Sequence, residues 1–301
     1  MENNSSISIL SKRKKTNLFH LKEIKKKEEK AVFITAYDYP LASLVDQAGV
    51  DMVLIGDSLG MTVLGHKTTL PVTMSDMIYH SQAVSRAVNY AYIIGDMPFM
   101  SYQPSDRDAV INAGRFIAEA NCDAVKCEGG RRVASRVKAM VDAGITVMGH
   151  LGLTPQNMGQ LGGFRIQGKT LEEYKVLVED AIALEQVGIS FLLLEAMPPE
   201  IAGEIRKHLS IPVYGIGAGN QLDGQLVILH DIIGLFDQFK PKFVERYCDA
   251  SSLIKNAVER YCFDVRMSLF PQEKHFYTIN AEELDKVRDY VSAEETAKAV
   301  Q

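Results

Sequence analysis

Short apolar runs recur along most of the chain and predict strands. Each run is four to six residues long and rich in Val, Ile and Leu. Such runs are typical of strands that are buried on both faces of a parallel sheet. They lie at residues 32–36, 52–55, 91–95, 123–128, 145–150, 190–195, 211–216 and 226–230.

The stretches between these runs predict helices. Gly49, Gly144 and Gly188 each follow a helical stretch, and glycine is a common residue after a helix C-terminus. Thr73 and Asp76 have the spacing of a capping box at a helix N-terminus. The expected helices lie at 18–30, 42–48, 73–88, 109–120, 133–143, 172–186 and 200–208, with two more at 245–262 and 282–299. Long connections are expected at 59–71 and 151–172.

This alternation over about 200 residues favours a (β/α)8 TIM barrel, an α/β fold, with a helical C-terminal extension. A doubly wound open sheet is the alternative. Its glycine-rich fingerprint should follow the first strand, where this chain instead has Tyr37-Asp38-Tyr39-Pro40.

Composition narrows the class of protein. A hydrophobic content of 47% in 301 residues permits a large core, and a net charge of −5 indicates no nucleic-acid surface. No apolar run reaches the roughly 18 residues that a membrane span needs. Four cysteines without CxxC or zinc spacing indicate reduced packing residues of a cytoplasmic protein.

The N-terminal stretch is basic, with nine Lys or Arg against four Glu in the first thirty residues. One interpretation is a basic arm or a transit peptide, which would place the protein in mitochondria if its source is eukaryotic. The other, which we favour, is a frayed terminus that leads into a solvated helix.

Polar residues stand where the predicted strands end, and that is where barrel enzymes carry their active sites. They are Tyr37, Asp57 with Ser58, Asp96, Lys126 with Glu128, His150, Glu195 and His230. Asp57, Asp96 and Glu128 come from adjacent strands and could bind one hard cation, for which oxygen ligands favour Mg²⁺ or Mn²⁺ over zinc. The alternative is that each acid only caps the next helix.

The other polar residues at the strand ends have more than one interpretation. Lys126 either neutralises the acids or holds a substrate carboxylate, and His150 is either a site residue or a core histidine. The apolar residues before Glu195 favour a carboxylate with a raised pKa that acts as a base. The run 215–219, Gly-Ile-Gly-Ala-Gly, either cradles a phosphate or makes a tight turn.

Several motifs, in this order, resemble the ketopantoate hydroxymethyltransferase family over about residues 16–271. They are Asp57-Ser58-Leu59-Gly60-Met61, Gly65-His66 with Thr69-Leu70-Pro71-Val72-Thr73, Asp96-Met97-Pro98-Phe99-Met100, Val125-Lys126-Cys127-Glu128-Gly129-Gly130, the run 149–156, Leu194-Glu195 and the run 215–219. The resemblance implies hydroxymethyl transfer from 5,10-methylenetetrahydrofolate to 3-methyl-2-oxobutanoate, which gives ketopantoate for pantothenate and coenzyme A synthesis.

The same resemblance implies roles for particular residues. Asp57 and Asp96 would be direct Mg²⁺ ligands, and Glu128 would belong to the metal's shell. Ser58 and Lys126 would hold the keto acid, His150 would lie near the incoming hydroxymethyl group, and Glu195 would accept the proton.

The resemblance also implies the fold type and the assembly. The barrel would be of the phosphoenolpyruvate mutase/isocitrate lyase type, in a homodecamer built as a pentamer of dimers. Residues 1–15 would be a flexible leader, 16–271 the catalytic barrel and 272–301 a polar helical extension past the family's usual end. Cys127 stands where an aliphatic residue is usual.

Two other functions compete with this interpretation. A carbon–carbon lyase or mutase of the related barrels would act on another 2-oxo acid, but such enzymes generally use a reactive loop cysteine, and Cys122 and Cys127 fall before or within a strand. A catalytically silent scaffold is the second, against which the joint presence of Asp57, Asp96, Lys126 and Glu195 argues.

Overall fold

The computed structural model describes residues 13–163, 165–236 and 241–299. Among these residues, eight parallel strands pair in chain order and close into a barrel, because β1 also pairs with β8. The strands are β1 (Ala31–Thr35), β2 (Met52–Ile55), β3 (Tyr92–Asp96), β4 (Ala124–Glu128), β5 (Val147–Gly152), β6 (Phe191–Glu195), β7 (Val213–Ile216) and β8 (Gly224–Val227). The predicted (β/α)8 fold is confirmed.

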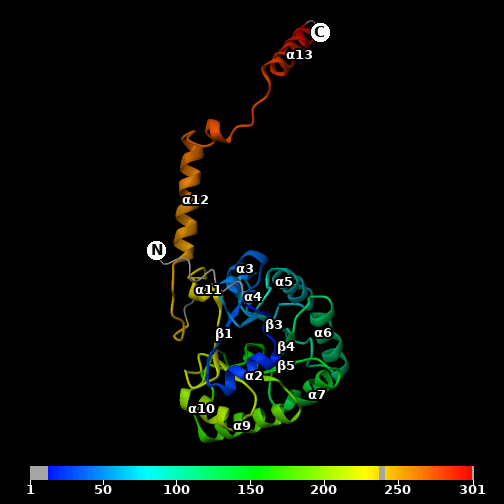
Figure 1. The fold of residues 1–301 in the computed structure, drawn as a ribbon, viewed down its shortest axis with the longest axis vertical. Coiled ribbons are helices and arrows are strands. Elements are labelled where there is room, and N and C mark those ends of the chain that lie inside the picture. Colours follow the sequence, from blue (N-terminus) through cyan, green and yellow to red (C-terminus); the bar gives the residue numbers. More distant parts are fainter. Residues whose placement is uncertain (1–12, 164, 237–240, 300–301) are drawn as a thin grey trace. The chain divides into compact units, whose positions relative to one another are not determined.

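Helices surround the strands on the outside (Figure 1). They are α3 (Tyr39–Gln47), α5 (Met74–Ala87), α6 (Asp106–Ala118), α7 (Ala134–Asp142), α9 (Leu171–Gln186) and α10 (Pro199–Lys207). The capping box at the start of α5 is confirmed: the Thr73 hydroxyl accepts from Asp76 N, and the Asp76 carboxylate accepts from Thr73 N. Gly49, Gly144 and Gly188 have φ values of 99°, 85° and 101°, which glycine adopts without strain where a helix ends.

Helix α2 (Leu18–Lys26) covers one end of the barrel (Figure 1). Its Leu21 and Ile24 are buried in one cluster with side chains of the barrel interior. Lys25 Nζ donates to the carbonyl of Ile211, just before β7, at 2.7 Å. This helix therefore closes the end at which the strands begin, and leaves the opposite end to the loops that follow the strands.

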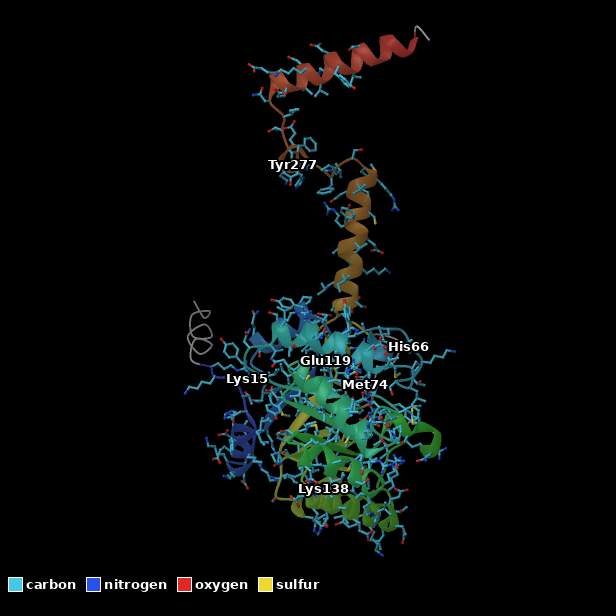
Figure 2. The ribbon with its side chains drawn as sticks, turned by 90° about the vertical axis from the view of Figure 1, so that its right-hand side faces the viewer. Lys15, His66, Met74, Glu119, Lys138 and Tyr277 are labelled. Carbon is cyan, nitrogen blue, oxygen red and sulfur yellow. The ribbon has the colours of Figure 1, made fainter. Side chains whose placement is uncertain are left out.

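Residues 13–15 of the predicted flexible leader are bonded to the barrel. The Arg13 guanidinium donates to the carbonyls of Asp46 and Val50. Lys15, labelled in Figure 2, donates to the Ala91 carbonyl at 2.6 Å and to Asp123 at 2.8 Å. The rest of the leader, residues 1–12, lies outside the described residues.

The eighth strand was predicted at 226–230 but spans Gly224–Val227, and residues Leu229–Ile232 form the short helix α11. The Leu229 amide donates to the Thr35 hydroxyl at 3.2 Å instead of continuing the strand pairing. The strand begins at Gly224, where a side chain would lie 2.4 Å from the Ala31 carbonyl. Because this position has to be glycine, the apolar pattern does not include the start of the strand. An apolar run alone does not separate a strand from a short buried helix.

The two long connections contain short helices. Residues 59–71 include α4 (Leu59–Thr62), and residues 151–172 include the 3₁₀ turn η2 (Pro155–Asn157) and α8 (Met158–Leu161). No helix within the described residues is long and apolar enough to cross a membrane.

The chain divides into two compact units, Met1–Cys248 and Asp249–Gln301. The second unit contains α12 (Ala250–Arg266), η3 (Glu273–His275) and α13 (Ala281–Ala299). The predicted boundary between barrel and extension, at residue 271, thus falls after α12, whereas the compact unit around the barrel ends before it.

Candidate active site

The polar residues predicted at the strand ends converge because side chains alternate along a strand. On β3 to β6, every second side chain points into the barrel. The first inward positions are apolar and form one buried cluster: Tyr92 and Ile94, Ala124, Met148, and Phe191 and Leu193. Continuing each series by two residues gives Asp96, Lys126 with Glu128, His150 and Glu195. The barrel interior therefore ends in a polar layer at the carboxyl ends of the strands.

Lys126 is the positive charge of this layer. It is 3% exposed, and its Nζ lies 2.7 Å from Asp96 and 3.4 Å from Glu128. Strand register explains both contacts, since Asp96 pairs with Lys126 across β3 and β4, and Glu128 lies two residues further on the same face. Burial acts to lower the pKa of Lys126, but the neighbouring carboxylates outweigh it and the pKa is raised. In the structure, Lys126 neutralises its acidic neighbours.

His150 bridges two carboxylates. Its Nδ1 lies 3.3 Å from Glu128, and its Nε2 lies 3.1 Å from Glu195. Neither contact has the geometry of a hydrogen bond, and each is an ion pair when the ring is protonated. Burial and the Lys126 charge lower the pKa of His150, but Glu128 and Glu195 outweigh them and raise it to about 9. The bridge gives Glu195 a charged neighbour that the apolar residues before it did not predict.

Asp57 and Ser58 follow β2 after a single residue, Gly56. The Asp57 amide donates to the Asp96 carboxylate at 3.1 Å, so the two Gly-Asp sequences meet in space. The Ser58 hydroxyl is 2.8 Å from the Tyr37 hydroxyl. Gly56 permits this turn, because a side chain there would lie 2.8 Å from the Ser58 oxygen.

The carboxylates carry more negative charge than Lys126 offsets. Burial, and then the charge of Asp96, raise the pKa of Asp57 well above its ordinary value. Burial also raises the pKa of Asp96, against the opposing effect of Lys126. Burial acts to raise the pKa of Glu128 too, but Lys126 and His150 outweigh it and lower it. Asp57 and Asp96 are therefore the pair that a bound cation would stabilise most.

The carboxylates of this site fit a magnesium ion that keeps water or substrate ligands better than they fit a metal ion held by protein ligands alone. Among the residues that the structure describes, no three His, Cys, Asp or Glu side chains are arranged to hold a metal ion. Magnesium often binds through one or two carboxylates and completes its shell with water and substrate oxygens. Asp57 and Asp96 can supply that pair, while Glu128 faces Lys126 and His150.

Sequence reasoning missed Gln156 and Tyr102 as members of the site. Gln156 lies in η2 and is 3% exposed, and its side chain donates to Asp57 at 3.0 Å. The buried Tyr102 hydroxyl accepts from Glu128 N at 2.8 Å and lies 2.9 Å from Gln156 Oε1. The only sequence signal for Gln156 was its place at the end of the motif 149–156.

Two sequence candidates lie apart from the carboxylates. His230 lies on α11, and its ring packs 5.2 Å from that of Tyr37. In the run 215–219, a side chain at Gly217 would lie 2.6 Å from the Phe243 ring, and one at Gly219 would lie 2.4 Å from Pro199. Close packing explains both glycines, which favours the tight turn over the phosphate cradle.

The four cysteines are free thiols. Cys122 and Cys127 are buried, and burial raises the pKa of each to about 12. Neither is therefore a reactive thiolate near neutral pH.

Comparison with known proteins identifies the family. Residues 15–273 match the model of the family described as ketopantoate hydroxymethyltransferase. The 3-methyl-2-oxobutanoate hydroxymethyltransferase of Syntrophomonas wolfei subsp. wolfei is 52% identical over 267 residues, which are 89% of this chain and 97% of that protein. The protein of the same name from Moorella thermoacetica is 48% identical over 89% of this chain and 100% of its own length.

Solved structures with low identity share the fold. A phosphonopyruvate hydrolase has a TM-score of 0.57 at 13% identity and covers 95% of this chain and 98% of its own. A 2,3-dimethylmalate lyase of the phosphoenolpyruvate mutase/isocitrate lyase superfamily has a TM-score of 0.53 at 13% identity, over 95% and 99%. The barrel thus shares the fold of these structures, and the chain belongs to the ketopantoate hydroxymethyltransferase family.

Proposed function

We propose that this protein transfers a hydroxymethyl group from 5,10-methylenetetrahydrofolate to 3-methyl-2-oxobutanoate, with water supplying the hydroxyl oxygen. The product is ketopantoate (2-dehydropantoate), and the reaction begins pantothenate and coenzyme A synthesis. The observation that carries the proposal is the continuous polar layer from Asp57 and Asp96 through Lys126 and His150 to Glu195. Relatives about half identical over almost their whole length support it.

The chemical problem is to remove a weakly acidic proton from the carbon next to a ketone. When bound, a divalent cation such as Mg²⁺ would supply Lewis-acid stabilisation of the charge that develops on the ketone oxygen, and Asp57 and Asp96 would hold it. Lys126 offsets the charge of the substrate carboxylate, and the Ser58 hydroxyl, held by Tyr37, donates to the keto acid.

Glu195 is the residue we assign as proton acceptor. Its side chain is 16% exposed, whereas those of Asp96 and Glu128 are 2% and 1% exposed. A carboxylate that must meet a substrate carbon needs such access. His150 lies 3.1 Å from Glu195 and holds the carboxylate at the rim of the polar layer.

The competing functions have less support. A lyase or mutase that depends on a reactive cysteine is disfavoured by the burial of Cys122 and Cys127. A silent scaffold has no need of a buried lysine in contact with two carboxylates, which costs desolvation free energy.

The test is proton exchange at the substrate. The protein is incubated with Mg²⁺ and 3-methyl-2-oxobutanoate in D₂O, and the C3 proton is followed by NMR. We expect exchange that stops with EDTA and slows at least about 100-fold in Glu195→Gln, since a positioned base contributes roughly that factor or more. Glu119→Gln, an exposed residue at the end of α6 labelled in Figure 2, is the matched control. Exchange of the C3 proton without a metal would contradict the proposal. So would the absence of exchange when active folate is present.

A further inference from the structure

Each polar atom of the Gln156 carboxamide has two partners within hydrogen-bond distance. Its Nε2 donates to Asp57 Oδ2 at 3.0 Å and to the Met97 carbonyl at 2.9 Å. Its Oε1 lies 2.9 Å from the Tyr102 hydroxyl and accepts from Gln103 Nε2 at 3.0 Å. A buried amide with every partner in place is held in one orientation.

That orientation is set by the surroundings. Turning the amide over would place Oε1 against the Asp57 carboxylate and Nε2 against the Gln103 amide, which are both repulsive contacts. Burial, and then the charge of Glu128, raise the pKa of Tyr102 well above its ordinary value, so its hydroxyl stays protonated. The neighbours of Gln156 therefore fix its donor side toward Asp57.

Gln156 also contacts a second carboxylate. Its backbone amide donates to Glu128 Oε2 at 3.0 Å. Asp57 follows β2 and Glu128 ends β4, whereas Gln156 lies in η2 after β5. One loop residue thus joins acidic residues of two other strand ends.

We propose that Gln156 is a positioning residue that holds Asp57 by Oδ2, so that Oδ1 is presented to the divalent cation. The inference rests on the proposed function, because it concerns the cation that the reaction would use. A carboxylate without this bond can rotate, and it must lose that freedom when the cation binds. Removing such an outer partner typically costs about 10- to 100-fold in metal affinity.

The experiment is calorimetric titration of the full-length protein with Mg²⁺ alone. Gln156→Met keeps the length of the side chain and removes its hydrogen bonds, and we expect its Kd for Mg²⁺ to rise by about 10- to 100-fold. Tyr102→Phe removes one partner of Oε1, together with the contacts of the same hydroxyl to the Glu128 backbone, and should raise the Kd by at least about 3-fold, the worth of one neutral hydrogen bond. Thermal unfolding in EDTA checks that both variants are folded.

Asn157→Ala is the matched control. Asn157 lies in the same turn and bonds to the Thr154 hydroxyl at 3.0 Å. The Kd of Asn157→Ala for Mg²⁺ should equal that of the wild type. If Asn157→Ala lost as much affinity as Gln156→Met, the effect would belong to the turn as a whole and the inference would be overturned. A folded Gln156→Met variant with an unchanged Kd for Mg²⁺ would also overturn the inference. If Gln156→Met does not fold, an unchanged Kd in Tyr102→Phe would overturn it. Wild-type protein that binds no Mg²⁺ would instead refute the metal's role in the proposed function, and the inference with it.

Discussion

At the scale of single residues, the positive charge of Lys126 stabilises the charged forms of the buried acids Asp57, Asp96 and Glu128. Replacing it in Lys126→Met leaves Asp57 and Asp96 without their buried counter-charge, and leaves Glu128 with His150 alone. We expect a loss of about 3–5 kcal/mol in the free energy of unfolding at pH 8, measured by urea titration in EDTA. The pKa values of Asp57 and Asp96 are already raised in the fold and will rise further. The folded variant then binds more protons than the unfolded chain above about pH 4, so its stability recovers as the pH falls from 8 to 5.

The control for this prediction is Lys138→Met. Lys138, labelled in Figure 2, has a 54% exposed side chain on α7 and pairs with Asp142 one turn along the helix. An exposed pair of this kind contributes about 0.5 kcal/mol or less. A loss in Lys126→Met that stays the same from pH 5 to pH 8 would show that packing, not charge, is responsible.

The site residues on strands or within three residues of a strand end could be predicted from sequence, and those farther along the loops could not. Alternation along a strand fixes the face of Asp96, Lys126 and His150 as soon as the strand is recognised. Gln156 and Tyr102 reach the same place on the loops that follow β5 and β3, whose path depends on contacts that form only in the folded chain. No period in the sequence encodes that convergence.

At the scale of elements, the end of β5 sets the position of the end of β6. Gly152 has a φ of 92°, and a side chain there would lie 2.3 Å from the Glu195 carbonyl. Gly152→Ala must therefore push the two strand ends apart, and with them the carboxylate that we assign as the base. We expect C3 exchange at least about 10-fold slower, because small displacements of a reacting group cost rate steeply.

Gly144→Ala provides the comparison for Gly152→Ala. Gly144 also has a positive φ, 85°, but nothing lies within 4 Å of the position its side chain would take. It carries the backbone strain without the collision and without contact to the site. Equal slowing of exchange in both variants would mean that the close approach to Glu195 is irrelevant.

The eighth strand shows what element prediction cannot reach. The strand begins at Gly224, where the Ala31 backbone lies too close for a side chain. A strand that begins with glycine has a shorter apolar pattern in the sequence than its length in the structure. The end of the eighth strand merges with the start of α11 in one apolar run, 226–229. The other seven strands were found within two residues of their ends because polar or glycine residues bound them.

At the scale of the whole barrel, stability and chemistry lie at opposite ends. Helix α2 closes the end where strands begin, and its Leu21 is fully buried against the interior. Leu21→Ala should lower the free energy of unfolding by about 2–5 kcal/mol, the usual cost of such a cavity. The rate of C3 exchange per folded molecule should stay unchanged, because the polar layer lies at the other end of the strands.

Phe19→Ala, on the same helix, separates burial from helix propensity. Phe19 is 78% exposed, so its loss should change the free energy of unfolding by no more than about 0.5 kcal/mol. Urea unfolding and NMR exchange on the same samples give both quantities. If Leu21→Ala slowed exchange in proportion to its lost stability, the interior between Leu21 and Lys126 would have to transmit the disturbance. Stability and catalysis would then not be separated between the two ends of the barrel, and α2 would help to position the polar layer.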